Sequence, residues 1–240
     1  MSTYVATDLH GMYNLWEGIR DYLKEDDKLI YLGDAIDRGP RGWELMVELF
    51  NDPRVIYLKG NHEELMYWAF KAPDEYIKTY EENWVNINGG DKTLYQIKEL
   101  GVSDEELDFY LKRIRNLPTC YIYLNDNGNI FHLSHAGMNP DALYYDLDIG
   151  DQDYTHLWDR RHIFREWPED GSYDDYYVIH GHTPIQLLHK ADTFIDGIQK
   201  DVPFVYANGH KIDLDVSSIN TNMAILYNLD TEQEVFIKGV

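Results

Sequence analysis

Five short clusters of residues suited to metal chemistry each follow an apolar run, where that run ends. Their side chains are carboxylates, amides and imidazoles, and each cluster has a glycine that lets the backbone turn sharply. In chain order they are Asp8-Leu9-His10-Gly11, Gly33-Asp34-Ala35-Ile36-Asp37-Arg38-Gly39, Gly60-Asn61-His62-Glu63, Ser134-His135-Ala136-Gly137 and Gly181-His182-Thr183-Pro184. One such cluster is more often a turn or a helix cap. Five indicate a metal centre, because folding alone does not require repeated Asp, Asn and His beside Gly.

The segments that position these clusters have the pattern of an α/β sheet. Residues 4–6, 29–32 and 55–58 are apolar and predict strands. Between them the spacing is helical, with two apolar faces formed by Leu15, Ile19, Tyr22 and Leu23 and by Leu45, Met46, Leu49 and Phe50. In α/β sheets functional groups collect just beyond the strand ends. Later strands are expected in a hairpin (121–124 and 130–133, around the turn 125–129), at 177–179, and at 223–227 and 234–237.

Residues 71–117 differ from the rest, being charged and helical in spacing, with Leu107, Tyr110, Leu111 and Ile114 on one face. They contain none of the cluster residues. We therefore expect a helical segment outside the motif core, either an insertion over the site or an outer layer. The length of 240 residues favours one domain spanning residues 1–240.

Composition limits the partners and the compartment. The formal net charge of -22 disfavours long DNA or RNA, since such binding depends on Lys and Arg neutralising phosphates. A small phosphorylated substrate remains compatible, because bound metal can reverse the local field. Cys120 is the only cysteine, the N-terminal residues have no signal-peptide pattern, and no run approaches the ~20 apolar residues of a membrane span. We expect a cytoplasmic protein without membrane partners.

The clusters resemble those of the calcineurin-like metallophosphoesterases, and within them the phosphoprotein phosphatase branch with its bacterial and bacteriophage relatives. The resemblance runs from Asp8 to Pro184, and its Gly-Asp-x-x-Asp-Arg-Gly and Gly-Asn-His-Glu blocks are highly specific. It implies a four-layer α-β-β-α sandwich of two mixed sheets flanked by helices. It also implies that two metal ions are held by Asp8 and His10 (first ion), Asp34 (bridging), and Asn61, His135 and His182 (second ion).

Physical arguments support these roles and add others. A carboxylate can bridge two ions about 3.5–4 Å apart, and a water shared by both ions loses a proton near neutral pH and becomes an in-line nucleophile. His62 is the natural general acid, with Asp37 holding its imidazolium. Arg38, Asn61 and a second arginine are expected to bind the phosphate. We choose Arg160 in Trp158-Asp159-Arg160, which resembles the Trp-x-Arg element of the phage enzymes, over Arg161. Imidazole with carboxylate favours Mn²⁺, with Fe or Zn as alternatives.

Two departures from the family pattern are informative. Thr7 replaces the glycine that usually opens the first block, but this position precedes the ligand and removes no donor. Pro184 stands where nuclease and cyclic-nucleotide branches have a second histidine, which adds a ligand to the first metal. The first metal is therefore expected to have one protein ligand fewer, which argues against a nuclease.

Other residues receive modest predictions. His180 and His182 are expected on one face of a strand, and the resemblance gives the metal to His182, leaving His180 a supporting or structural role. Glu63 is expected in an ion pair or a helix N-terminal contact, and Trp158 near the site. Surface or satisfied core positions, or a simple strand end, are expected for His132, His156, His162, His189, His210 and Ile212-Asp213-Leu214-Asp215.

Three functions follow from the resemblance. The first is hydrolysis of phosphate monoesters in the manner of a protein Ser/Thr phosphatase, on a phosphorylated protein or a small phosphorylated or nucleotide substrate. The second is symmetrical hydrolysis of dinucleoside polyphosphates such as diadenosine tetraphosphate. The intact Asp37-Arg38 pair and the Thr183-Pro184 ending favour the first. The third, a non-catalytic phosphate-binding scaffold, is disfavoured because the predicted acid, its partner and the bridging carboxylate are all present.

Overall fold

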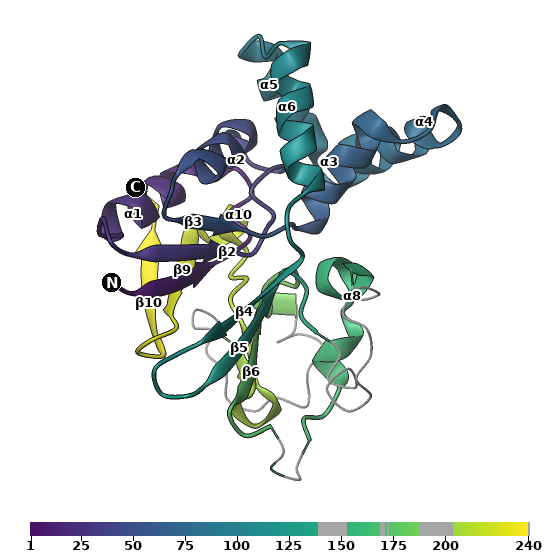
Figure 1. The fold of residues 1–240 in the computed structure, drawn as a ribbon. Coiled ribbons are helices and arrows are strands. Elements are labelled where there is room, and N and C mark those ends of the chain that lie inside the picture. The colour runs from purple at the N-terminus through teal and green to yellow at the C-terminus, as the bar shows by residue number, and fades with distance from the viewer. Residues whose placement is uncertain (139–152, 169–170, 172, 188–203, 240) are drawn as a thin grey trace.

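The computed structural model describes residues 1–138, 153–168, 171, 173–187 and 204–239. Two mixed sheets of five strands form the centre of the described part (Figure 1). The first sheet has the order β10-β9-β1-β2-β3, with β1 (Thr3–Ala6), β2 (Lys28–Tyr31), β3 (Val55–Tyr57), β9 (Met223–Asn228) and β10 (Gln233–Lys238). The second has the order β4-β5-β6-β8-β7, with β4 (Cys120–Leu124), β5 (Ile130–Ser134), β6 (Tyr176–His180), β7 (Phe204–Tyr206) and β8 (Lys211–Asp213).

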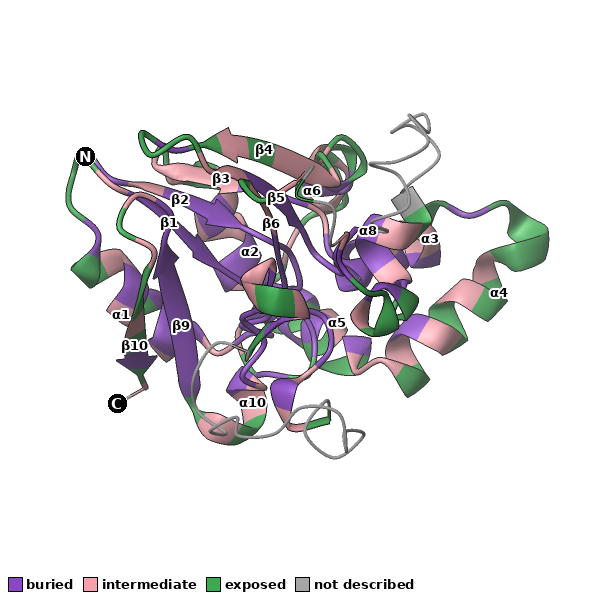
Figure 2. Ribbon diagram, turned by 90° about the horizontal axis from the view of Figure 1, so that it is seen from below, coloured by how far each residue is buried: buried purple, intermediate pink, exposed green. Residues whose placement is uncertain are grey.

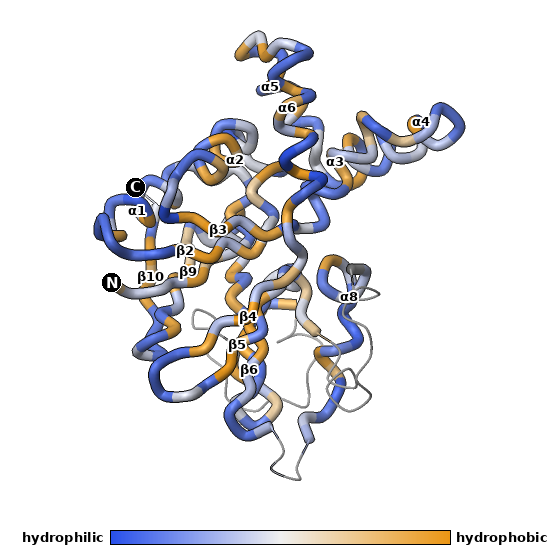
Figure 3. The backbone as a smooth tube through the Cα atoms, viewed as in Figure 1, coloured by the Kyte–Doolittle hydropathy of each residue, from blue (hydrophilic) through white to orange (hydrophobic). Residues whose placement is uncertain are grey.

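Strand residues alternate between two hydrophobic cores, because successive side chains of a strand point to opposite faces. In β2, Leu29 and Tyr31 pack in a core beneath the helices, whereas Ile30 faces Phe131 and Ile179 of the second sheet. The central strands β1 and β9 are accordingly buried in Figure 2, whereas the edge strands β4 and β10 are partly exposed. Figure 3 shows hydrophobic residues along the strands of both sheets. The two sheets thus share an inner core and each has an outer layer, as the expected sandwich requires.

Helices cover the outer faces. Helices α1 (Tyr13–Tyr22) and α2 (Gly42–Asn51) pack on the first sheet, and Leu15, Ile19, Leu45 and Met46 from the predicted apolar faces are fully buried there. Tyr22 was predicted on the same face but is 43% exposed at the last position of the helix. The second sheet has α8 (Asp153–Trp158) beside it, while α10 (Ser218–Thr221) lies next to β9. Short 3₁₀ turns occur at η3 (Arg161–Phe164) and η4 (Ala207–Gly209).

A helical segment projects beyond the sheets (Figure 1). Helix α3 (Asn61–Lys71) leads into it, and the segment itself contains α4 (Asp74–Glu82), the π-helical turn η1 (Asn83–Ile87), α5 (Gly90–Glu99) and α6 (Asp104–Arg115). The sequence fixes α6 at both ends: Ser103 accepts a hydrogen bond from the Glu106 N–H, three acidic residues open the helix and three basic residues close it. The segment is anchored where α6 packs on α3 and α5 packs on α2.

The parallel strand pairs decide where the clusters meet. β1, β2 and β3 are parallel to one another, and so are β5, β6 and β8. The carboxyl ends of parallel strands lie at the same edge of a sheet, so the residues that follow them are neighbours. No helix among the described residues has the length and apolar character needed to cross a bilayer.

Candidate metal centre and active site

Left-handed backbone at the strand ends aims the cluster side chains into one space. Non-glycine residues rarely adopt positive φ, and those that do concentrate at functional sites. Six of the predicted site residues have φ between 44° and 70°: Asp8, His10, Asp34, Asp37, Arg38 and His182. Nearby, a Cβ on Gly60 would lie 2.2 Å from Asp34 Oδ1, so only glycine allows this close approach.

The first group of potential ligands is centred on His10. Its Nε2 lies 3.6 Å from Asp34 Oδ2 and 4.0 Å from Asp8 Oδ1. Its Nδ1 lies 2.9 Å from the Ile36 carbonyl oxygen, which only an N–H can satisfy, so Nε2 carries the lone pair. Burial lowers the pKa of His10 well below its usual value, which keeps the ring neutral. A neutral imidazole with its lone pair on the nitrogen that faces the site is the form that binds metal.

The second group brings His135, His182 and Asn61 together. His135 Nε2 is 2.8 Å from Asn61 Oδ1 and 3.1 Å from His182 Nδ1, and His182 Nδ1 is 2.9 Å from the same Asn61 oxygen. The Leu32 carbonyl accepts the His135 Nδ1–H, so Nε2 again faces inward as an acceptor. Burial lowers the pKa of both rings. Three donor atoms converging at such distances from separate strand ends fit one metal ion.

Asp34 joins the two groups. Its Oδ2 faces His10, while its Oδ1 lies 3.5 Å from His135 Nε2 and accepts a hydrogen bond from the His62 N–H. The ligand atoms of His10, Asp34 and His62 lie within 4.8 Å of one another, as do those of Asp34, His135 and His182. Because Asp34 belongs to both groups, its carboxylate has the position that a ligand bridging two ions needs. The donor set therefore fits a pair of divalent metal ions.

Glu63 and Asp8 hold the backbone of this centre. Glu63 accepts hydrogen bonds from the N–H groups of Asp34, Ala35 and Gly60, so it makes the helix N-terminal contact that the sequence predicted and also fixes the second cluster. Asp8 Oδ2 accepts the His182 N–H at 3.0 Å, which ties the first cluster to the last.

His62 and Asp37 form a buried pair beside the metal groups. The Asp37 carboxylate accepts the His62 Nδ1–H at 2.7 Å, and it also accepts hydrogen bonds from Thr93 Oγ1 at 2.7 Å and Trp84 Nε1 at 2.8 Å. Burial raises the pKa of Asp37 to about 7, against the lowering effect of those last two bonds. Burial also lowers the pKa of His62 well below its usual value.

Trp84 and Thr93 belong to the helical segment 71–117, to which the sequence assigned no role. They lie in η1 and α5, and both are fully or almost fully buried. Neither adjoins a motif in the sequence, so no signal there distinguishes them from packing residues. The segment carries no ligand, yet it supplies two of the hydrogen bonds that orient Asp37.

The two predicted arginines contact different clusters of the site. Arg38 places Nη1 2.8 Å from His10 Nε2 and Nη2 2.9 Å from His62 Nε2. Arg160 donates from Nε to Thr183 Oγ1 at 3.0 Å, which brings it to the last cluster. Arg161 instead pairs with Asp159, with Nε 2.9 Å from Oδ1. This difference favours Arg160 as the second phosphate ligand.

The expectation that His180 and His182 share a strand face is wrong. β6 ends at His180, and His182 lies beyond it with φ at 69°, so the chain has turned between them. His180 packs away from the metal groups, with Nε2 2.7 Å from the Tyr206 hydroxyl and Nδ1 3.0 Å from the Gly181 carbonyl oxygen. Both of its nitrogens are therefore in use. Trp158 lies near the site as expected, its ring centroid 6.4 Å from that of His182.

Other modest predictions need correction. Asp213 does end β8, but it and Asp215 are buried, and their hydrogen bonds to the N–H groups of Asp215 and Ser217 shape the loop that follows. Burial raises both carboxyl pKa values well above normal. His132 and His162 are buried, and neither Nε2 has a hydrogen-bond partner among the described residues. His189 lies outside the described residues.

Comparisons with known proteins agree with this geometry. Serine/threonine-protein phosphatase 2 of Escherichia coli is 27% identical over 94% of this chain and 92% of its own length, and that of Salmonella typhimurium is 34% identical over 88% and 85%. Bis(5'-nucleosyl)-tetraphosphatase PrpE [asymmetrical] of Bacillus velezensis is 27% identical over 78% and 79%.

The fold likewise has solved counterparts. A protein serine/threonine phosphatase structure from Saccharomyces cerevisiae superposes with a TM-score of 0.56 at 14% identity, covering all of this chain and 80% of that one. The family model described as calcineurin-like phosphoesterase matches residues 1–213. The chain therefore belongs to the calcineurin-like phosphoesterases, and it is a metal-dependent hydrolase of phosphate esters.

Proposed function

We propose that this hydrolase removes phosphate from monoesters of the kind carried by phosphoserine and phosphothreonine in proteins. One observation carries the proposal: Asp34 belongs to two converging ligand groups, and the hydrogen-bonded His62–Asp37 pair lies next to it. A bridging carboxylate supports a pair of ions, and an adjacent imidazole held by a carboxylate supports proton transfer to a leaving group.

In this proposal Asp8, His10, Asp34, Asn61, His135 and His182 hold the metals. Two bound divalent ions would neutralise phosphate charge and lower the pKa of a shared water. His62 donates the proton to the leaving oxygen from Nε2, because Nδ1 is engaged by Asp37. Arg38 Nη2, which lies 2.9 Å from that Nε2, would turn to the phosphate oxygens when substrate binds. Arg38, Asn61 and Arg160 bind and orient the phosphate oxygens, where bidentate arginine contacts also stabilise transition-state charge.

Mn²⁺ is the metal that we propose for both positions, because three imidazoles stand among the ligands and Mg²⁺ prefers an all-oxygen shell. Chelated protein should lose hydrolysis of p-nitrophenyl phosphate, and stoichiometric Mn²⁺ should restore it far better than excess Mg²⁺. Elemental analysis of the reloaded protein should find two ions per chain. Full activity after exhaustive chelation would end the two-metal proposal.

The substrate class is tested by comparing the hydrolysis of two candidate substrates. A phosphothreonine peptide and diadenosine tetraphosphate are offered separately to the Mn²⁺-loaded protein, and kcat/KM is compared. The proposal requires the peptide to be preferred. The nucleotide candidate rests on the tetraphosphatase relative, whose designation is asymmetrical, whereas the sequence pattern pointed to symmetrical cleavage. Chromatography separates these outcomes, since symmetrical cleavage yields only ADP and asymmetrical cleavage yields ATP with AMP.

Charge supports a compact substrate over a long polyanion, given the formal net charge of -22. A cytoplasmic location stays a prediction, motivated by the single cysteine Cys120, which cannot form an internal disulfide.

A further inference from the structure

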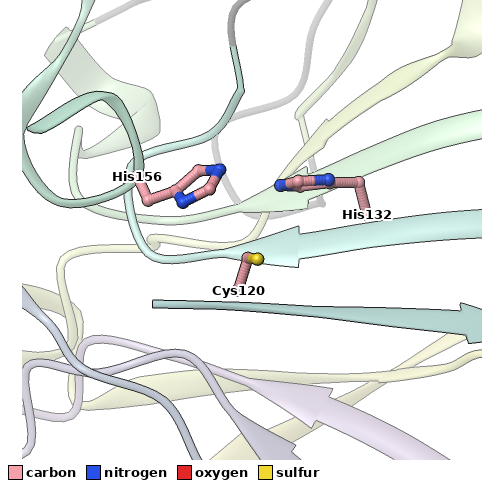
Figure 4. Close-up of side chains that lie close together, drawn as sticks. All are labelled: Cys120, His132 and His156. Atoms are coloured by element: carbon pink, nitrogen blue, oxygen red, sulfur yellow. The ribbon is translucent and has the colours of Figure 1, made fainter. Parts of the chain in front are cut away.

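A second set of metal-binding side chains lies outside the five clusters. Cys120, His132 and His156 bring one sulfur and two ring nitrogens within 4.8 Å of one another. In Figure 4 the two imidazoles point toward each other, and the Cys120 sulfur lies beside the space between them. His132 and His156 are 4% and 1% exposed, while Cys120 is half-buried at the start of β4.

The fold itself produces this arrangement. In the β4–β5 pair Cys120 is opposite Ser134 and Ile122 is opposite His132, so Cys120 and His132 are diagonal neighbours on one face. His156 reaches the same face from α8, whose position is fixed by a hydrogen bond from the Ala136 N–H to the His156 carbonyl oxygen at 2.6 Å. Three separate elements thus contribute one donor each.

The orientation of the rings indicates a ligand. His132 Nε2 is buried and has no hydrogen-bond partner among the described residues, a costly situation for a ring nitrogen. The other nitrogens lie against hydroxyls: His132 Nδ1 is 3.4 Å from the Tyr176 oxygen and His156 Nδ1 is 3.3 Å from Thr119 Oγ1. Outer contacts of this kind hold metal-ligating histidines in place. Burial lowers the pKa of His132 to about 3, so the ring stays neutral near pH 7.

We propose that Cys120, His132 and His156 form a third metal site, which binds Zn²⁺. Thiolate with two imidazoles is a donor set that zinc accepts, with water completing the four ligands. Binding converts the Cys120 thiol to a thiolate and releases its proton to solvent. The predicted catalytic ligands are nitrogen and oxygen atoms only, whereas this site adds a soft thiolate ligand, so the two sites should prefer different metal ions.

Such an ion would join α8 to the β4–β5 hairpin. This matters for the catalytic centre because α8 ends at Trp158, two residues before Arg160. Trp158 Nε1 also donates to Glu64 at 2.8 Å, which links the same helix to α3. We therefore expect Zn²⁺ at this site to stabilise the segment that carries Arg160.

Cobalt spectroscopy of the full chain tests the proposal, because Cys120 is the only cysteine. Metal-free protein is titrated with Co²⁺, and a near-ultraviolet thiolate-to-cobalt charge-transfer band is expected to saturate at one sulfur-bound ion per chain. Zn²⁺ should then displace the cobalt and abolish the band. Absence of the band at saturating Co²⁺ would overturn the proposal.

Variants show whether the histidines share the ion. His132→Asn and His156→Gln keep the thiol but should weaken the sulfur-bound ion more than about 100-fold, since loss of a ligand exceeds the 10–100-fold effect of an outer contact. Asp34→Asn removes the proposed catalytic bridge, and His210→Asn alters a half-buried histidine outside the set; both should keep the band. An unchanged band in His132→Asn would overturn the site.

Melting curves give a second readout that does not depend on cobalt. Zn²⁺ should raise the melting temperature of Asp34→Asn and should raise that of the double variant Asp34→Asn/Cys120→Ser much less, because both carry the same altered catalytic centre. Circular dichroism without metal checks that each variant is folded. Equal shifts in the two variants would contradict a zinc site at Cys120.

Discussion

The position of the His62 ring is compatible with two roles, metal ligand and proton donor. Its Nε2 is 3.7 Å from Asp34 Oδ2, so these two atoms could bind the same metal ion. Its Nδ1 is 2.7 Å from Asp37 Oδ2, a contact that would orient the ring as a proton donor. A carboxylate on Nδ1 stabilises the charged imidazolium, which favours the donor role. The two roles predict opposite effects on metal content.

Replacing His62 with Asn should leave both catalytic ions bound and lower kcat by ~10²–10⁴, the usual contribution of a positioned proton donor. The loss should shrink for p-nitrophenyl phosphate compared with an alkyl phosphate, because an acidic leaving group needs no proton. Turnover of both substrates and elemental analysis provide the measurement. Fewer bound ions in the variant would identify His62 as a ligand.

His182 and His180 allow a second test between adjacent imidazoles. His182→Ala removes a nitrogen 2.9 Å from Asn61 Oδ1, so it should lower occupancy of the second ion and nearly abolish activity. His180→Ala removes only contacts to Tyr206 and Gly181, so both ions should stay and the rate should fall by at most 10- to about 100-fold. The reverse pattern would show that His180, and not His182, is the metal ligand in the last cluster.

At the scale of elements, the projecting helices complete the site. Trp84 of η1 and Thr93 of α5 both donate to Asp37, which in turn holds His62. The proton donor therefore depends on a segment that contributes no ligand. A packing role alone would place apolar atoms against Asp37, whereas here two hydrogen bonds offset the burial of a carboxylate.

Replacing Trp84 with Phe tests this dependence, since it removes the N–H and keeps most of the packing. We expect kcat to fall roughly 10-fold with KM little changed, the scale of a lost outer contact. The loss should again be smaller for substrates with acidic leaving groups. Trp68→Phe is the matched control, because Trp68 lies in the neighbouring helix α3 and stacks on Tyr80 of α4. Equal losses in both variants would indicate general destabilisation.

Sequence reasoning found what local chemistry determines. Glycine beside Asp or His at the end of an apolar run is visible in the sequence, so Asp8, Asp34 and His135 were placed at strand ends correctly. Contacts between distant segments were not visible: Trp84 meets Asp37 47 positions away, and His156 meets His132 only after α8 packs on the second sheet. Both pairings depend on tertiary packing, and neither leaves a periodic or motif signal.

Across the whole molecule, two kinds of buried titratable group have opposite effects on how stability depends on pH. Buried neutral histidines such as His180, whose pKa burial lowers to about 4, bind fewer protons when folded than when unfolded. They destabilise the fold as pH drops below the unfolded value of about 6.5. Buried carboxyls such as Asp213, whose pKa burial raises, have the opposite sign. The pH dependence of the unfolding free energy contains contributions from both kinds of group. Comparing a variant with the native protein isolates the contribution of one residue.

Replacing His180 with Asn should therefore reduce the loss of unfolding free energy that occurs as the pH falls below 6.5. Between pH 6.5 and 5 the native protein should lose about 1.5 kcal/mol more unfolding free energy than the variant, since one such group contributes at most about 1.4 kcal/mol per pH unit and about half of that at pH 6.5. Denaturant titrations in chelator at several pH values measure this difference and remove competition from metals. Parallel profiles for His180→Asn and the native chain would mean that His180 does not remain neutral when folded.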